Sequence, residues 1–294
     1  MYLLNQSNNR VRRRGISILE TIVDEGNADA RVYAALAFGY AVLGHSPFPE
    51  GMYPASRSAA ERALAMDDSI GEIYMALGMH EMYYEWDIDA AEAQLQRALE
   101  LNPNLVGAVY HYAWLMELWQ HSDKAIPLGV RTVELDPLSS FMQGNLASQY
   151  RNDGQLDEAV RIADIGIELN PRNTNAIRVK GLSIALQGDF DSAVDVLEPM
   201  REDPAWGAEY GIVLAMAGRE QEARDFLAEI EKEPRNVIAL IRLHAALGDY
   251  DEVFQWLGVA REVRLPWYPW FITWFPNTEA DLRNDPRMDE LAAE

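Results

Sequence analysis

The sequence predicts an all-α protein in which helical hairpins repeat along the chain. Three segments end alike and place their prolines 34 residues apart: ALELNPN at 98–104, TVELDPL at 132–138 and GIELNPR at 166–172. Between them, apolar residues follow the i, i+3, i+4 and i+7 spacing of helices, and no segment shows the alternation of a strand. A period of this length is the signature of a stacked repeat architecture.

Each repeat is predicted to consist of a helix, a glycine turn, a second helix and a proline stop. Glycine accepts the left-handed backbone that closes a helix, and we expect this conformation at Gly154, Gly188, Gly218 and Gly248. Acidic residues after the turn suit the start of the next helix. We therefore interpret the pairs Asp87/Asp89, Asp189/Asp191 and Asp249/Asp251 as helix caps. A calcium loop of the EF-hand type would also need its glycine and a glutamate at position 12.

Small residues recur at two fixed places within the period. With the proline counted as position 32, position 8 is Gly78, Ala113, Ala147, Gly181 or Gly211, and position 20 is Ala91, Ala125, Ala159, Ala193 or Ala223. This pattern resembles the tetratricopeptide repeat. The resemblance implies a right-handed superhelix of helical hairpins, in which a larger side chain at a close helix contact would cost ~1–3 kcal/mol.

The resemblance divides the chain into a solenoid over 1–264 and a C-terminal cap over 265–294. We expect a partial unit at 1–27 followed by units at 28–70, 71–104, 105–138, 139–172, 173–204, 205–235 and 236–264. Unit 28–70 carries an insertion at 44–54, and unit 71–104 has one extra residue near Tyr84–Trp86. Each unit would bury its apolar faces against its neighbours.

Three segments are similar to one bacterial subgroup of these repeats: YEWDIDAAEAQLQRALELNPN, the insertion before it, and LRNDPRMDEL. In that subgroup the repeats form the C-terminal part of signalling proteins with winged-helix regulators, class III nucleotide cyclases or serine/threonine kinases. None of those domains is present in this sequence. The resemblance implies a regulatory region of bacterial origin, and the chain is expected to be a fragment or an orphaned region.

Composition excludes several classes of protein. With 25 basic and 47 acidic residues the net charge is −22, which does not suit a phosphate backbone, so no nucleic-acid partner is expected. The absence of cysteine excludes a disulfide scaffold, a thiolate zinc site and a cysteine nucleophile. No apolar run approaches the ~20 residues of a membrane span, and the first residues lack the order of a secretory signal. We expect a cytoplasmic protein with no membrane contact.

Chemistry-bearing motifs are also missing from the sequence. We find no phosphate loop, no G-x-S-x-G and no H-E-x-x-H. His80 and His111 fall on the first helices of adjacent units, but no third ligand accompanies them. The sequence thus predicts a protein that is not an enzyme, with no catalytic residue, no metal and no cofactor.

The family implies a groove lined by positions 2, 5, 9, 12 and 13 of the first helices. On this sequence the predicted partner-binding residues are Arg31, Phe38, Met75, Met79, Met82, Tyr83, Tyr110, Trp114, Phe141, Arg151 and Arg178. Methionine and aromatic side chains suit varied apolar partners, and Arg151 and Arg178 suit a carboxylate. The other interpretation is that these side chains pack between adjacent helices. The net charge favours a basic partner.

The segment RLPWYPWFITWFPN at 264–277 combines aromatic residues with prolines, which we expect to prevent a regular helix. One interpretation is a cap over the end of the stack. The other is a self-association patch of Trp267, Trp270 and Trp274 that would form a homodimer.

Taken together, the sequence predicts a scaffold that binds a protein or peptide in its groove. The alternative is a sensor region that binds a small ligand and controls a missing output domain.

Overall fold

A computed structural model describes residues 9–45, 52–203, 206–232, 237–273, 282 and 284–293. These residues form helices and turns, with no strand among them, so the predicted all-α class is confirmed. They fall into two compact units. Unit 1 comprises the described residues up to Leu115 together with Val263–Pro269, and unit 2 comprises those of Met116–Glu262 and those from Trp270 onward.

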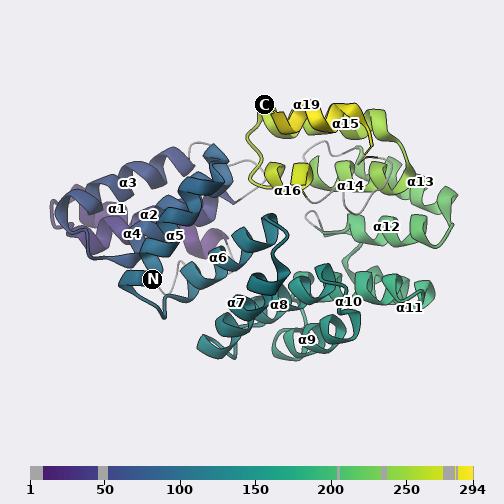
Figure 1. The fold of residues 1–294 in the computed structure, drawn as a ribbon, viewed down its shortest axis with the longest axis horizontal. Coiled ribbons are helices and arrows are strands. Elements are labelled where there is room, and N and C mark those ends of the chain that lie inside the picture. Colours follow the sequence, from purple (N-terminus) through teal and green to yellow (C-terminus); the bar gives the residue numbers. More distant parts are fainter. Residues whose placement is uncertain are drawn as a thin grey trace. The chain divides into compact units, whose positions relative to one another are not determined.

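Unit 1 is built from one single helix and successive hairpins (Figure 1). Its helices are α1 (Asn9–Asp24), α2 (Ala30–Gly44), α3 (Met52–Met66), α4 (Gly71–His80) with its π-helical extension η1 (Glu81–Glu85), α5 (Ile88–Leu101) and the first part of α6 (Val106–Leu118). Helix α2 packs on α3 and α4 on α5, and α2 also packs on α4. The first helices of neighbouring hairpins therefore lie side by side.

Unit 2 continues the same pattern (Figure 1). Its helices are α7 (Ser122–Leu135), α8 (Ser140–Asn152), α9 (Leu156–Leu169), α10 (Thr174–Leu186), α11 (Phe190–Leu197), η2 (Glu198–Met200), α12 (Ala208–Met216), α13 (Glu220–Ile230), α14 (Val237–Leu247), α15 (Tyr250–Glu262) and α19 (Pro286–Ala293), with most of α16 (Tyr268–Thr273). Helix α8 contacts α10, α10 contacts α12, and α12 contacts α14. These first helices form one layer, which carries the candidate site.

The predicted glycine turns are confirmed. Gly154, Gly188, Gly218 and Gly248 have φ angles of 81°, 93°, 73° and 77°, in the left-handed region that glycine adopts without strain. The turn between α6 and α7 lacks a glycine, and there Gln120 takes the left-handed conformation with φ 58°.

The small residues lie at close helix contacts, as the period predicted. Ala91, Ala125, Ala159, Ala193 and Ala223 are at most 1% exposed. A Cβ added to Gly181 on α10 would lie 2.5 Å from Leu197 Cγ on α11. The absence of a side chain at position 181 thus allows the two helices of this hairpin to approach.

The extra residue predicted near Tyr84–Trp86 lies in the wide turn of η1. The π-helical turn Glu81–Glu85 extends α4, and Trp86 ends it with a left-handed φ of 62°. Such turns take up a single inserted residue within a helix. The predicted insertion 44–54 includes the last residue of α2 and the first three residues of α3, and its residues 46–51 are outside the described part of the chain.

The aspartates after the turns do not all act as caps. Asp87 accepts a hydrogen bond from the Ala90 N–H at 2.9 Å, and Asp189 accepts one from the Ser192 N–H at 3.1 Å. Asp249 instead pairs with Arg224, whose Nη1 and Nη2 lie 2.9 and 3.2 Å from its carboxylate oxygens. An arginine on the preceding hairpin makes this position a contact between repeats.

We expected the prolines of 264–277 to prevent a regular helix, and this was wrong for the short segment Tyr268–Thr273. Helix α16 spans Tyr268–Thr273 and holds Pro269 at its second residue. Proline is tolerated in a first turn because its missing N–H would have no partner within the helix. Residues 274–277 lie outside the described part.

Candidate functional site

The groove residues expected from the sequence lie on the first helices of successive hairpins. Arg31 and Phe38 are on α2, Met75 and Met79 on α4, Met82 and Tyr83 on η1, Tyr110 and Trp114 on α6, Phe141 and Arg151 on α8, and Arg178 on α10. The methionines are each 1% exposed, whereas Phe141 is 48% exposed. The methionine side chains therefore pack between helices of unit 1, and a partner-binding role for them stays a prediction.

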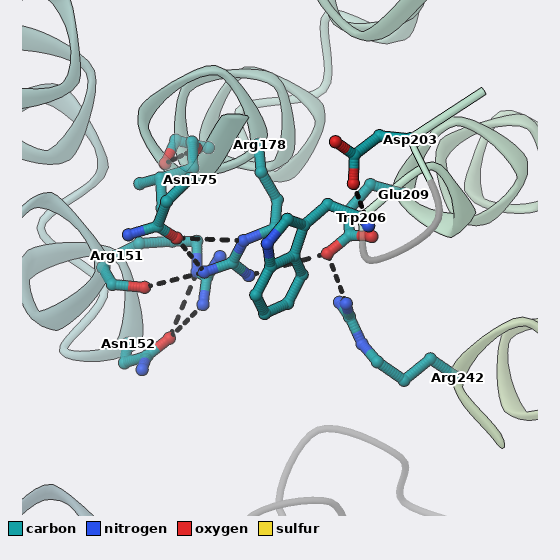
Figure 2. Close-up of polar contacts among 11 residues, drawn as sticks. Arg151, Asn152, Asn175, Arg178, Asp203, Trp206, Glu209 and Arg242 are labelled. Atoms are coloured by element: carbon teal, nitrogen blue, oxygen red, sulfur yellow. Dashed lines mark hydrogen bonds and ion pairs between the residues drawn. The ribbon is translucent and has the colours of Figure 1, made fainter. Parts of the chain in front are cut away.

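In unit 2 the first helices bring together a cluster of charged side chains (Figure 2). We call arginine cluster the set formed by Arg151 on α8, Arg178 on α10, Glu209 on α12 and Arg242 on α14, together with Glu117 on α6, which Asn152 links to Arg151. Arg178, Glu117 and Glu209 are buried, at 6%, 3% and 0% exposure. Charged residues are almost never this buried unless they are paired, so the contacts of each one matter.

Arg178 is held from four sides (Figure 2). Its Nε and Nη2 donate to Asn175 Oδ1 at 3.2 and 2.8 Å, and Nη2 also donates to Ser148 Oγ at 3.2 Å. Its Nη1 lies 3.6 Å from Glu209 Oε1. The guanidinium stacks over the Trp206 ring, 4.5 Å from the ring centroid. These contacts fix the orientation of the guanidinium.

Glu209 joins two of the arginines. Its Oε1 accepts a hydrogen bond from Arg242 Nη1 and also faces Arg178 (Figure 2). Its Oε2 is buried and has no hydrogen-bond partner among the described residues. One carboxylate is therefore shared by two guanidinium groups and retains an oxygen able to accept from a donor.

Arg151 takes part in a second series of hydrogen bonds in the cluster. Its Nε and Nη2 donate to Asn152 Oδ1 at 3.1 and 2.7 Å, and Asn152 Nδ2 donates to Glu117 Oε1. Arg151 Nη1 has no hydrogen-bond partner within the described residues. This buried donor is therefore unsatisfied within the described part of the chain.

Burial shifts the pKa values of the cluster. It raises the pKa of Glu117 to about 7 and lowers those of Arg178 and Arg151 to about 9 and about 10. The arginines stay charged at neutral pH, whereas Glu117 is partly protonated. Three guanidinium groups thus face two carboxylates, of which one is only partly ionised. In a chain with net charge −22 this is a local excess of positive charge, which suits an anionic group.

The sequence pointed to Arg151 and Arg178 but missed Glu209 and Arg242. Both missed residues stand alone among apolar neighbours in their first helices, AEYGIVLAM and VIALIRLHAAL. A lone charge on such a helix indicates a buried ion pair. The isolated charges were visible in the sequence, but the sequence does not show that Glu209 contacts Arg178 and Arg242.

Two tryptophans of the proposed self-association patch, Trp267 and Trp270, belong to different compact units. Trp267 belongs to unit 1, where its ring centroid is 5.0 Å from that of His45 and 5.8 Å from that of Trp114. Trp270 belongs to unit 2 and contacts Phe271 edge-on. Trp274 lies outside the described residues. Self-association through these residues stays a prediction.

The histidines considered as a metal pair have other partners. His80 Nδ1 lies 3.1 Å from the Tyr53 carbonyl oxygen, and His111 Nδ1 lies 3.1 Å from Tyr83 Oη. Across the described ranges, no group of three or more histidine, aspartate or glutamate side chains is arranged to hold a metal ion. In that same part of the chain, no helix has the length and apolar character needed to cross a membrane.

Comparison with solved structures decides the type of repeat. A thermophilic TPR protein from Thermus thermophilus aligns over 60% of this chain and 98% of its own, with 24% identity and a TM-score of 0.53. The chain has the tetratricopeptide-repeat fold. PilW, a type IV pilus biogenesis factor, aligns over 65% of this chain and 92% of its own, with 18% identity and a TM-score of 0.50. No family model matches the sequence, and neither does any curated protein.

Within the tetratricopeptide-repeat fold the arginine cluster has a defined place. Arg151, Arg178, Glu209 and Arg242 come from α8, α10, α12 and α14, which are the first helices of consecutive hairpins. Each of these helices contacts the next. A ligand at the cluster would therefore meet side chains from several repeats at once.

Proposed function

We propose that this protein is a non-enzymatic scaffold that binds a segment of a partner protein. The arginine cluster of unit 2 would receive an acidic side chain or a terminal carboxylate of that segment. The observation that carries the proposal is the shared contact of Arg178 and Arg242 with Glu209, next to Arg151, which reaches Glu117 through Asn152. Guanidinium groups bind carboxylates with charge-assisted and often bidentate hydrogen bonds.

The geometry of the cluster supports this role. Arg178 is held by Asn175, Ser148 and the Trp206 ring, so little side-chain freedom would be lost on binding. Arg151 is half-buried as a residue, and its buried Nη1 atom has no hydrogen-bond partner among the described residues. We therefore assign the first contact with the partner to Arg151 and a supporting electrostatic role to Arg178.

Exposed apolar residues at the start of the helix that carries Arg151 would provide the remaining contact. Phe141 lies on the same helix, and Leu138 precedes that helix at 79% exposure. Large exposed apolar side chains are anchor candidates at protein interfaces. The acidic surface of the chain favours basic residues elsewhere in the partner, so the proposed partner segment has one acidic anchor in apolar and basic surroundings.

A peptide-display selection tests this proposal. Three versions of the full chain serve as bait: wild type, Arg151→Gln and the control Arg161→Gln. Arg161 is a suitable control because it is exposed on α9 and pairs with Glu158. We expect wild type and the control to enrich peptides with an aspartate, a glutamate or a free terminus at one position. The Arg151→Gln variant should lose that enrichment. Selection of the same peptides by all three proteins would overturn the proposal.

A small-ligand sensor is the second candidate function, and one observation favours it. Glu209 is 0% exposed, yet its Oε2 has no hydrogen-bond partner in the described part of the chain. A small molecule with both an ammonium and a carboxylate group would satisfy Glu209 and Arg151 together. A rise in melting temperature with one member of an amino-acid panel, lost in Arg151→Gln, would support this candidate. An unchanged melting temperature across the panel would exclude it.

A further inference from the structure

A segment from beyond the last hairpin packs on unit 1. Residues Val263–Pro269 follow α15 in sequence, yet they belong to the same compact unit as α1–α5. They contact a surface formed by His45 at the end of α2, Tyr84 and Trp86 around η1, and Trp114 on α6. We call these four residues the aromatic surface. Residues Val263–Pro269 of the same chain thus lie on the aromatic surface.

Arg264 makes the polar part of this contact. Its Nη1 donates a hydrogen bond to the Tyr84 carbonyl oxygen at 2.7 Å and lies 3.7 Å from Glu85 Oε2. Its guanidinium lies 4.9 Å from the Tyr84 ring centroid and 5.6 Å from that of Trp86. A cation over aromatic faces, with a carbonyl and a carboxylate beside it, is a specific arrangement for an arginine side chain.

The apolar part comes from the residues that follow. Leu265 is 0% exposed. The Trp267 ring meets His45 and Trp114 edge-on, at interplanar angles of 73° and 72°. The Tyr268 ring lies 4.8 Å from the Trp86 ring, tilted by 30°. Together these residues cover the aromatic surface with a short segment that contains Pro266.

Backbone strain is present on both sides of this contact. Arg264 has φ 49° and Trp86 has φ 62°, both in the left-handed region. For residues with a large side chain such a conformation costs on the order of 1–3 kcal/mol and persists where surrounding contacts enforce it. Strained residues of this kind cluster at ligand clamps. Trp86 ends the π-helical turn η1 and Arg264 follows the end of α15, so each left-handed residue also closes a helix at the point where the two side chains meet.

We propose that the aromatic surface is a second binding site, separate from the arginine cluster. Its partner is a segment in which an arginine is followed by an aliphatic residue, a proline and two aromatic residues. The chain's own Arg264–Tyr268 occupies the site as an internal ligand that the partner displaces. Leu265–Tyr268 forms a turn in which the Tyr268 N–H donates to the Leu265 carbonyl oxygen at 2.9 Å, and Pro266 at its second position fixes the backbone of that turn. Tethering gives the internal ligand an effective concentration on the order of millimolar, so it competes strongly.

A synthetic peptide with the chain's own residues 263–269, blocked at both ends, tests the proposal as a probe. It is titrated against the wild-type chain, Arg264→Ala, and Arg264→Ala combined with Trp267→Ala. We expect weak binding to wild type and an apparent affinity roughly tenfold higher or more for the variants, because the internal competitor is weakened. The control variant Arg172→Ala, whose arginine is exposed on a turn of unit 2, should match wild type.

Two further binding measurements test whether the peptide occupies the aromatic surface. Adding Trp86→Ala to the Arg264→Ala chain should abolish the increase in apparent affinity for the peptide. A peptide with its arginine and tryptophan replaced by alanine should not bind to any of these proteins. Arg264 has a 46% exposed side chain, so Arg264→Ala alone is expected to fold, which its helical circular dichroism checks. Equal binding to wild type and Arg264→Ala would overturn the proposal. A wild-type dimer that the peptide converts to monomer would also overturn it, because the occupant would then be a second copy.

Discussion

The Nη1 atom of Arg178 lies 3.6 Å from Glu209 Oε1, and both side chains are buried. Glu209 Oε1 also accepts a hydrogen bond from Arg242. Removing a charge from water is costly, and an ion pair offsets that cost only while both partners remain. Glu209 is therefore the group on which the folded arrangement of the two arginines depends.

Replacing Glu209 by glutamine should destabilise unit 2. The side chain keeps its shape, but Arg178 and Arg242 lose their shared counter-charge inside the protein. We expect the free energy of unfolding to fall by about 3–5 kcal/mol, measured by chemical denaturation. The control Glu229→Gln removes a carboxylate from the exposed pair with Arg201 and should change the free energy by about 0–1 kcal/mol. Equal effects of the two substitutions would show that Glu209 does not balance the arginines.

Glu117 should make the stability of the protein depend on pH. Burial raises its pKa from the ordinary 4.5 to about 7, against the opposing effects of Asn152, Arg151 and Arg178 and with a smaller contribution from Asp153. The folded state therefore keeps the proton to higher pH than the unfolded state. The stabilisation due to protonated Glu117 is complete below about pH 4.5 and is lost as the pH rises through about 7.

The variant Glu117→Gln isolates this effect, because glutamine stays neutral at every pH. Between pH 4.5 and pH 8 the wild type should lose about 3 kcal/mol more of its unfolding free energy than the variant does. Chemical denaturation of both proteins across this range measures the difference. Parallel curves for the two proteins would rule out a raised pKa at Glu117.

Gly181→Ala should destabilise the hairpin of α10 and α11. The added Cβ would lie 2.5 Å from Leu197 Cγ, and Leu197 is 0% exposed and has little room to move. We expect a loss of about 1–3 kcal/mol in the free energy of unfolding. Gly258 on α15 is the matched control, since nothing lies within 4 Å of a Cβ there. Gly258→Ala should stabilise the helix by roughly 0.5–1 kcal/mol, and a gain at both positions would contradict the close approach.

The fold could be predicted from the sequence because its signals are local and repeated. The glycine turns depend on a backbone conformation that glycine adopts freely, and Ala159 and Ala193 mark close contacts at a fixed place in each period. The π-helical turn before Trp86 also left a local signal, an extra residue. Each of these features repeats or interrupts a period, so a single sequence is enough to find it.

The candidate site was predictable only in part. Arg151 and Arg178 were expected at inward positions of their repeats, but Glu209 meets Arg178 through a contact between residues more than 30 positions apart. The burial of Met75 and Met79 depends on how closely neighbouring first helices pack, which the period does not specify. The return of Arg264 to Tyr84 is a contact across 180 residues, and no local pattern records it.

The central claim, that Arg151 receives an acidic group of a partner, is tested most directly by a double-mutant cycle. A peptide selected on the wild-type chain and its neutral counterpart, with asparagine or glutamine for the acid or an amidated terminus, are each titrated against wild type and Arg151→Gln. The account predicts a coupling energy of about 1.5–3 kcal/mol between the acid and Arg151, typical of a hydrogen bond to a charged group. A coupling energy of zero, with both substitutions acting independently, would contradict it.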